Sequence, residues 1–174
     1  MEDGYAHIGR DETCIALYAF DGLRERTGCE VFTPPSTTRV TIFVNGINEL
    51  FEEYKAKGVN VIAISSNDVV GYPMDAPEHM TALAAEHGFT FPYLYDESQA
   101  VARAYDAACT PDFSVFDADM RCVYRGQFDG ARPGVDIPVT GEDMRRVLDA
   151  LLAGDTVPEE GQIPSLGCNI KWKA

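Results

Sequence analysis

From residue 39 onward the sequence alternates short β-branched apolar runs with segments of helical periodicity, and this alternation restricts the fold more than any other feature. The run at residues 40–44 is followed by a helical pattern at residues 47–57, which ends before Gly58. The next run, residues 59–65, is apolar at nearly every position, as is typical of a strand buried on both faces of a parallel sheet. Helical crossovers between such strands predict an α/β architecture.

The middle of the chain carries helix start and stop signals. Asp75 with Glu78 forms a capping-box pattern ahead of a predicted helix at residues 76–87, and Gly88 is its predicted end. After a short predicted strand at residues 91–95, Asp96 with Gln99 repeats the capping-box pattern. This second pattern predicts a helix that ends near residue 107.

The last third of the domain is predicted to be a hairpin followed by a helix. Strand-like runs at residues 113–116 and 122–125 flank a polar turn, in which aspartates favour local backbone hydrogen bonds. The final helix is predicted to begin at Thr140 and to end before Gly154. Its predicted buried face consists of Met144, Val147, Leu148, Leu151 and Leu152.

The element order β-α-β-α-β-α-β-β-α predicts a mixed central sheet, parallel in its crossovers, with helices on both faces. Residues 39–154 form the predicted domain. Residues 1–38 show little pattern beyond a candidate strand near residues 14–20, and residues 155–174 are interpreted as an acidic linker and a docked tail.

Composition and charge narrow the classes of partner. Lys and Arg number 14 against 28 Asp and Glu, a formal charge of −14, and such a field repels nucleic acid and anionic membrane surfaces. The first residues lack the basic start and apolar run of a secretory signal, so we expect a cytoplasmic protein. Five cysteines form an odd and scattered set, which favours reduced thiols over a disulfide framework.

A known family shares several of these segments. Cys109-Thr110-Pro111-Asp112, directly before the hairpin, resembles the thioredoxin fold, in which a cis Thr-Pro bond precedes the strand that faces the active site. Residues 58–174 more narrowly resemble the peroxiredoxin-like branch of the AhpC/TSA redoxins. The segments that carry this resemblance are residues 63–68, 91–98, 109–113, 124–129 and 167–173.

The sequence departs from that family at the position of the usual nucleophile. The family has a Cys-bearing segment before the helix that matches residues 47–57, where the helix N-terminus favours thiolate. Here residues 43–44 run directly into Asn45-Gly46, and no cysteine lies between Cys29 and Cys109. A deletion, a divergent N-terminus or a shifted reading frame would each produce this pattern.

The resemblance leaves two well-placed thiols. Cys109 lies two residues before the predicted cis-proline, and Cys168 lies in the tail, where a resolving cysteine is often found. Thr110 and Pro111 are the residues that the resemblance assigns to a substrate groove. The alternatives are that Cys109 is a small buried hydrophobe, and that Cys168 packs beneath a docked tail.

Two functions follow from this set of residues. The first is a thiol-dependent oxidoreductase or antioxidant acting on thiol, disulfide or peroxide substrates, which requires no metal or organic cofactor. The second is a catalytically silent module that binds an extended peptide along Thr110 and Pro111. His7, His79 and His87 show no metal-ligand spacing. The sequence therefore predicts a thioredoxin-like scaffold with thiol chemistry or peptide binding.

Overall fold

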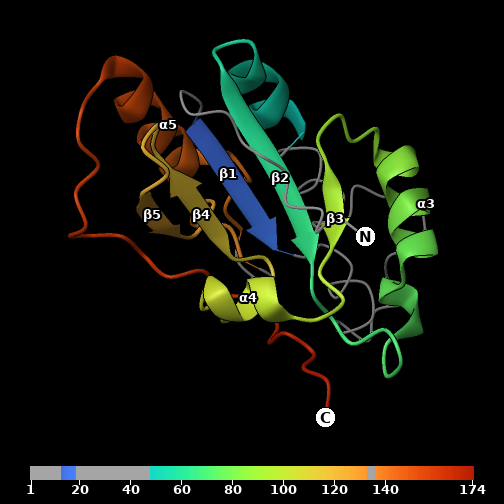
Figure 1. The fold of residues 1–174 in the computed structure, drawn as a ribbon. Coiled ribbons are helices and arrows are strands. Elements are labelled where there is room, and N and C mark those ends of the chain that lie inside the picture. Colours follow the sequence, from blue (N-terminus) through green and yellow to red (C-terminus); the bar gives the residue numbers. More distant parts are fainter. Residues whose placement is uncertain (1–12, 19–47, 133–135) are drawn as a thin grey trace.

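The computed structural model describes residues 13–18, 48–132 and 136–174, the first range by its backbone (Figure 1). The described residues contain a five-stranded sheet in the order β3-β2-β1-β4-β5. The strands are β1 Thr13–Tyr18, β2 Val59–Ser65, β3 Tyr93–Tyr95, β4 Phe113–Phe116 and β5 Cys122–Gly126. β2 agrees with its predicted range, whereas β3 begins two residues later than predicted.

β1 occupies the middle of the sheet. It pairs in parallel with β2, with Thr13 opposite Val59, and antiparallel with β4, with Cys14 opposite Phe116. β2 and β3 are parallel, and β4 and β5 form the predicted antiparallel hairpin. The prediction of a mixed sheet is confirmed, and so is the strand expected near residues 14–20. The strand predicted at residues 40–44 lies outside the described residues.

Alternate residues of β2 pack into two hydrophobic cores, one on each face of the sheet. Val59, Val61 and Ala63 belong to the larger core, whereas Ile64 and the partly buried Ile62 belong to the smaller one. The larger core contains side chains from the helix at residues 48–55 and from α5 (Glu142–Ala153). The smaller core contains Ala102 of α4 (Ala100–Ala104). Helices therefore cover both faces, as predicted.

The N-terminus of α3 (Pro77–His87) differs from the capping-box prediction. Its N-cap is Ala76, and no side chain caps it. Asp75 instead lies buried in the short 3₁₀ helix η2 (Pro73–Asp75), where its carboxylate accepts a hydrogen bond of 2.7 Å from the Asn67 amide. The capping-box prediction was wrong here because a residue outside the local sequence engages the carboxylate.

The capping box predicted for helix α4 was wrong, because the helix starts three residues later than the box requires. The Asp96 carboxylate still accepts a hydrogen bond of 3.0 Å from the backbone N–H of Ala102 in the first turn. Gln99 is the N-cap residue, in the left-handed conformation with φ 61°, and its side chain reaches the C-terminal tail instead. Helix α5 begins at Glu142, two residues after the predicted start.

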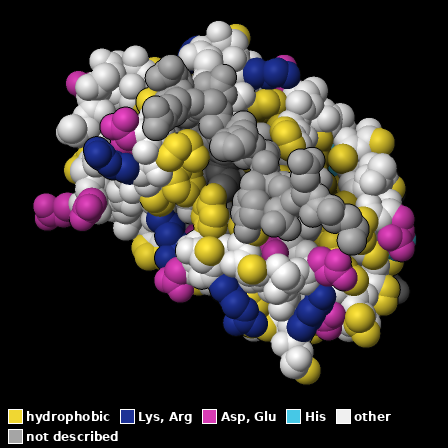
Figure 2. All heavy atoms as spheres, in the orientation of Figure 1, with side chains coloured by type: hydrophobic (Ala, Val, Ile, Leu, Met, Phe, Trp, Pro, Cys, Tyr) yellow, Lys and Arg dark blue, Asp and Glu magenta, His cyan; other side chains and the backbone are white. Residues whose placement is uncertain are grey.

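The part of the chain that the structure describes shows neither a membrane span nor a metal-binding cluster. No helix there has the length and apolar character to cross a membrane, and no group of three or more His, Cys, Asp or Glu residues is gathered for a metal ion. Lys and Arg side chains lie close to Asp and Glu on the face shown in Figure 2. Charges of both signs therefore share this face.

Candidate active site

The residues assigned to a substrate groove lie immediately before β4. The peptide bond between Thr110 and Pro111 is cis, as the resemblance implied. Thr110 is 1% exposed, and Cys109 before it is also buried. The segment Cys109-Thr110-Pro111 is therefore a buried turn, and its backbone lies against another segment of the chain.

That segment is the C-terminal strap, which we define as residues 163–173. It follows α5 and a linker, and in Figure 1 it runs past α4 to the C-terminus. It begins beside β5, where the Ile163 carbonyl accepts a hydrogen bond of 2.8 Å from the Gln127 N–H. The Ser165 hydroxyl then donates to the Gly126 carbonyl, at 2.6 Å. The strap thus follows the edge of the sheet before it reaches Thr110.

Thr110 and Cys168 form an antiparallel backbone bridge. The Thr110 N–H donates to the Cys168 carbonyl at 2.7 Å, and the Cys168 N–H donates to the Thr110 carbonyl at 3.3 Å. The Thr110 hydroxyl also lies 3.3 Å from the Cys168 carbonyl oxygen. A Cβ at Gly167 would overlap the Thr110 carbonyl, so only glycine fits here without movement. The backbone edge predicted to bind a peptide is already bound to the protein's own tail.

The strap also covers the Cys109 thiol. Burial, followed by the negative charge of Asp112, raises the pKa of Cys109 from 9.0 to about 11. Arg125 and a hydrogen bond from the Gly167 backbone oppose this rise, and the charge of a Cys168 thiolate would add to it. Cys109 is therefore a protonated thiol near neutral pH, and Cys168 is close enough to influence it.

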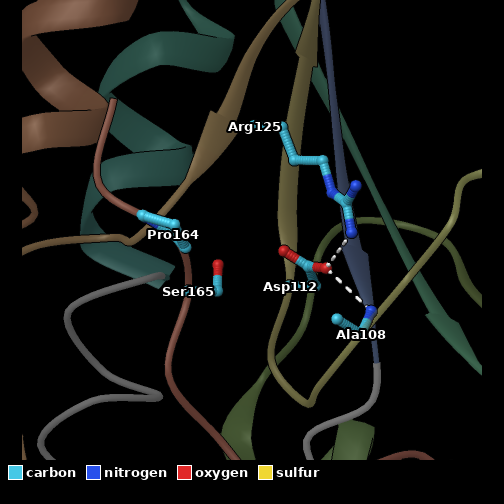
Figure 3. A pocket seen from close by; sticks show the side chains of 5 residues that line it. All are labelled: Ala108, Asp112, Arg125, Pro164 and Ser165. Carbon is cyan, nitrogen blue, oxygen red and sulfur yellow. Dashed lines mark hydrogen bonds and ion pairs between the residues drawn. The ribbon is translucent and has the colours of Figure 1, made fainter. Parts of the chain in front are cut away.

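A charged cluster borders Cys109. The Arg125 guanidinium bonds to the carboxylates of Asp112 and Asp106, each at 3.2 Å, and the Asp112 carboxylate also accepts the Ala108 N–H at 3.1 Å. Burial lowers the pKa of Arg125, but the hydrogen bonds and charges of the two aspartates raise it overall. Figure 3 shows Arg125 and Asp112 pointing toward one another beside a hollow of about 220 Å³. The strap residues Pro164 and Ser165 complete its lining.

The tail is docked, which was one of the two interpretations of its sequence. Ile170 is 3% exposed and packs in the smaller core. The Arg103 guanidinium lies 4.4 Å from the centre of the Trp172 ring. Cys168 remains partly exposed. The docked strap therefore places the Cys168 backbone against Thr110, the neighbour of Cys109, and both cysteines are free thiols.

The raised pKa of Cys109 predicts a specific alkaline loss of stability. The unfolded chain releases the thiol proton at the ordinary value of 9.0, below the folded value of about 11. Stability conferred by this group is thus complete below pH 9 and is lost as the pH rises toward 11. Denaturant unfolding on both sides of this window should show a smaller alkaline loss for Cys109→Ala than for the wild type.

Raised tyrosine pKa values make the comparison between variants necessary. Burial raises the pKa of both Tyr54 and Tyr124 to about 12 and also raises the pKa of Tyr95, so these groups also weaken the fold at high pH. They are present in the wild type and in Cys109→Ala, and their effect cancels in the difference. Equal alkaline losses for the two proteins would contradict the placement of the Cys109 thiol.

Sequence patterns missed three residues of this site. The amides of Asn67 and Gln99 hold the end of the strap, and Gly167 permits its close approach to Thr110. Gly167 belongs to a segment that carried the family resemblance, which was the only signal for it. Asn67 likewise lies in such a segment, but Gln99 carried a capping pattern that concealed its contact with the tail.

Comparison with known proteins gives the family. A model of the AhpC/TSA family matches residues 27–125, more than half of the chain. The comparison with curated proteins gave no match.

Solved structures show the same relationship. An uncharacterized conserved protein from Geobacillus kaustophilus is 48% identical, with a TM-score of 0.78 over 94% of this chain and 78% of its own. A hypothetical protein from Sinorhizobium meliloti 1021 is 38% identical, with a TM-score of 0.81 over 95% and 82%. A thioredoxin-like protein in its oxidized form shares the fold, with 17% identity and a TM-score of 0.56 over 86% and 87%. The chain therefore belongs to the AhpC/TSA family and has the thioredoxin-like fold of the redoxins.

Proposed function

We propose that this protein is a thiol-dependent oxidoreductase in which Cys168 meets a peroxide or disulfide substrate and Cys109 resolves the product. The observation that carries this function is the backbone bridge between Thr110 and Cys168, which brings the tail against the residue that follows Cys109. Cys168 is partly exposed, whereas Cys109 is buried with a raised pKa, so the two thiols suit different roles. Family membership supports thiol or peroxide substrates in general.

The reaction with a peroxide uses two electrons from two thiols. The Cys168 thiolate attacks one peroxide oxygen and the O–O bond breaks, so that Cys168 becomes a sulfenic acid and the leaving oxygen takes a proton to form water or an alcohol. The Cys109 sulfur then loses its proton and attacks the Cys168 sulfur. A disulfide forms and water leaves. An external thiol reductant returns both residues to the starting state.

The role of Cys109 depends on the order of these steps. A thiol with a pKa of about 11 is a poor first nucleophile near neutral pH, because little of it is thiolate. As a resolving thiol it needs to react only after Cys168 has been oxidised beside it. This order assigns the first reaction to the exposed residue and protects the buried one from direct oxidation.

Peroxide oxidation followed by mass analysis tests this function. We expect dilute peroxide to remove two hydrogens from the reduced wild type, and peptide mapping to locate a disulfide between Cys109 and Cys168. Cys168→Ser should abolish that disulfide, whereas Cys109→Ser should accumulate sulfenic acid at Cys168. Cys122→Ser is the control, because the exposed Cys122 lies on β5 with its thiol directed to the Tyr124 carbonyl, at 3.4 Å.

Two results would overturn the proposal. In one, peroxide leaves both Cys109 and Cys168 reduced while the protein is folded. In the other, Cys14 or Cys29 is oxidised first and the Cys168→Ser variant reacts as fast as the wild type. The mapping must therefore follow all five cysteines.

A catalytically silent peptide-binding module is the second candidate function. It is favoured by the backbone bridge itself, because the Thr110 edge accepts an extended segment of the protein's own chain. The lack of any cysteine between Cys29 and Cys109 also favours it. The same oxidation experiment separates the candidates, since a silent module should show no thiol that reacts with dilute peroxide in the folded state.

A further inference from the structure

The end of the strap is held by two buried amide side chains. The Asn67 carbonyl oxygen accepts the Lys171 N–H at 2.9 Å. Gln99 donates to the Lys171 carbonyl at 2.8 Å and accepts the Lys173 N–H at 2.9 Å. Both amides are 1% exposed. We call this pair of residues the amide clamp.

The amide clamp is itself fixed by buried partners. Asn67 donates to the Asp75 carboxylate at 2.7 Å, and Gln99 donates to the Ser66 carbonyl at 2.6 Å. Such hydrogen bonds restrict the orientation of both amides, so that each presents a defined acceptor to the strap. Each hydrogen bond between the clamp and the strap goes to a backbone atom of the strap. The clamp therefore fixes where the strap lies, independent of the side chains at residues 171 and 173.

The position of Cys168 depends on what lies on either side of it. On one side, Gly167 lies against the Thr110 carbonyl, and its backbone bonds to the Cys109 thiol. On the other side, Ile170 fills the smaller core and the amide clamp holds the next residues. The bridge to Thr110 is isolated from the strands of the sheet. The strap is therefore held on both sides of this bridge, on the C-terminal side by the clamp together with the Asp68 N–H, which donates to the Lys171 carbonyl at 2.8 Å.

We propose that Asn67 and Gln99 are positioning residues that keep the strap closed over Cys109 and thereby hold Cys168 in place to react with it. Neither amide hydrogen-bonds to a thiol of the described residues, so both act through the strap backbone. The catalytic consequence rests on the proposed thiol function, whereas closure over Cys109 is a property of the folded protein by itself. Asn67 and Gln99 thus act on the two thiols from a distance, by fixing the backbone of the strap that carries Cys168.

Alkylation of Cys109 in the folded protein measures strap opening. Gln99→Met keeps an unbranched side chain of similar length but removes its hydrogen bonds to the strap. We expect Cys109 to be alkylated about tenfold faster in this variant, because the loss of buried hydrogen bonds favours the open strap. Gly167→Ala opens the strap from the other side of Cys168, through overlap with Thr110, and should also accelerate the reaction.

Each variant has a matched control. Gln127→Met makes the same substitution at another buried glutamine, whose side chain bonds to Asp143 at 2.6 Å and to Arg132. Gln127 contacts the strap through its backbone N–H, at the Ile163 carbonyl, and the substitution keeps that bond. Gly130→Ala makes the same substitution at a glycine where a Cβ would come no closer than 3.9 Å to the Ile137 side chain. Both controls should leave the alkylation rate of Cys109 at the wild-type value. Circular dichroism confirms that each variant is folded before labelling.

The pH profile distinguishes strap opening from general loosening. In the wild type, alkylation of Cys109 should rise with pH up to about 11, the pKa that burial imposes. Opening the strap exposes the thiol to water, so in Gln99→Met the profile should shift toward the ordinary thiol value. Wild-type rates in both Gln99→Met and Gly167→Ala would overturn the inference, as would equal acceleration by the two controls.

The proposed function and this inference can be tested independently of each other. If peroxide forms no disulfide between Cys109 and Cys168 in the wild type, the oxidoreductase function fails, while the alkylation rates still decide whether the amide clamp closes the strap. If the disulfide does form, Gln99→Met should form it more slowly than Gln127→Met does. Equal rates of disulfide formation in these two variants would overturn the positioning role.

Discussion

The Leu148→Ala variant is expected to lose about 2–5 kcal/mol of its free energy of unfolding, as is usual for a buried leucine truncated to alanine. Leu148 is completely buried in α5 and packs in the larger core with Val147 and Phe113. Truncation removes those contacts and leaves a cavity, which the hydrogen-bonded sheet opposite can fill only in part. Denaturant unfolding of the variant and the wild type measures the loss.

Leu152→Ala is the matched control. It makes the same substitution one turn further along the helix, at a side chain that is 41% exposed. Its expected cost is below about 1 kcal/mol, since surface substitutions rarely change stability by more. If Leu148→Ala cost no more than this control, α5 would not pack on the sheet as the structure shows.

This comparison also shows how far helical periodicity predicts a buried face. The pattern placed both Leu148 and Leu152 on that face, and the structure corrects the second. Successive residues turn by about 100°, so Leu152 lies at the border of the stripe centred on Met144, Val147 and Leu151. Periodicity identifies the centre of a stripe well. Which border residues are covered depends on the shape of the neighbouring element, which the helix sequence does not contain.

The strands and the hairpin were predictable because their signals are local. β2 is an apolar run of the expected length, and the turn before β5 is closed by Asp117, whose carboxylate accepts the N–H groups of Asp119 and Arg121. The cis-proline turn beside Cys109 followed from the family resemblance. Each of these features is encoded within a few residues of its own position.

The amide clamp was not predictable, because it joins residues that are far apart in the chain. Lys171 and Asn67 are separated by 104 positions, and Lys173 and Gln99 by 74. Asp96 with Gln99 has the same pattern as an ordinary capping box, and only the arrival of the strap determines which way Gln99 turns. The choice between a free tail and a docked tail likewise depended on these long-range contacts.

The Asp129→Ala variant is expected to lose about 2–4 kcal/mol of stability, because one buried carboxylate satisfies three backbone N–H groups. One of its oxygens accepts the N–H groups of Thr140 and Gly141, both at 2.7 Å, and the other accepts Ala131 at 2.9 Å. Asp129 is 1% exposed. It fixes the two residues that immediately precede α5. Alanine would leave these donors without their acceptor.

Two further variants test whether the stability that Asp129 confers comes from its hydrogen bonds to buried backbone N–H groups. Asp129→Asn keeps one carbonyl oxygen, which can still accept Thr140 and Gly141, but its amide group turns a donor toward the Ala131 N–H. Its cost should therefore fall between those of alanine and the wild type. Asp117→Ala is the control, since that carboxylate also accepts two backbone N–H groups, but on an exposed turn where water replaces it. Denaturant unfolding should show a loss below about 1 kcal/mol for this control. An Asp117→Ala loss equal to that of Asp129→Ala would contradict the view that the Asp129 carboxylate stabilises the protein because the donors it binds are buried.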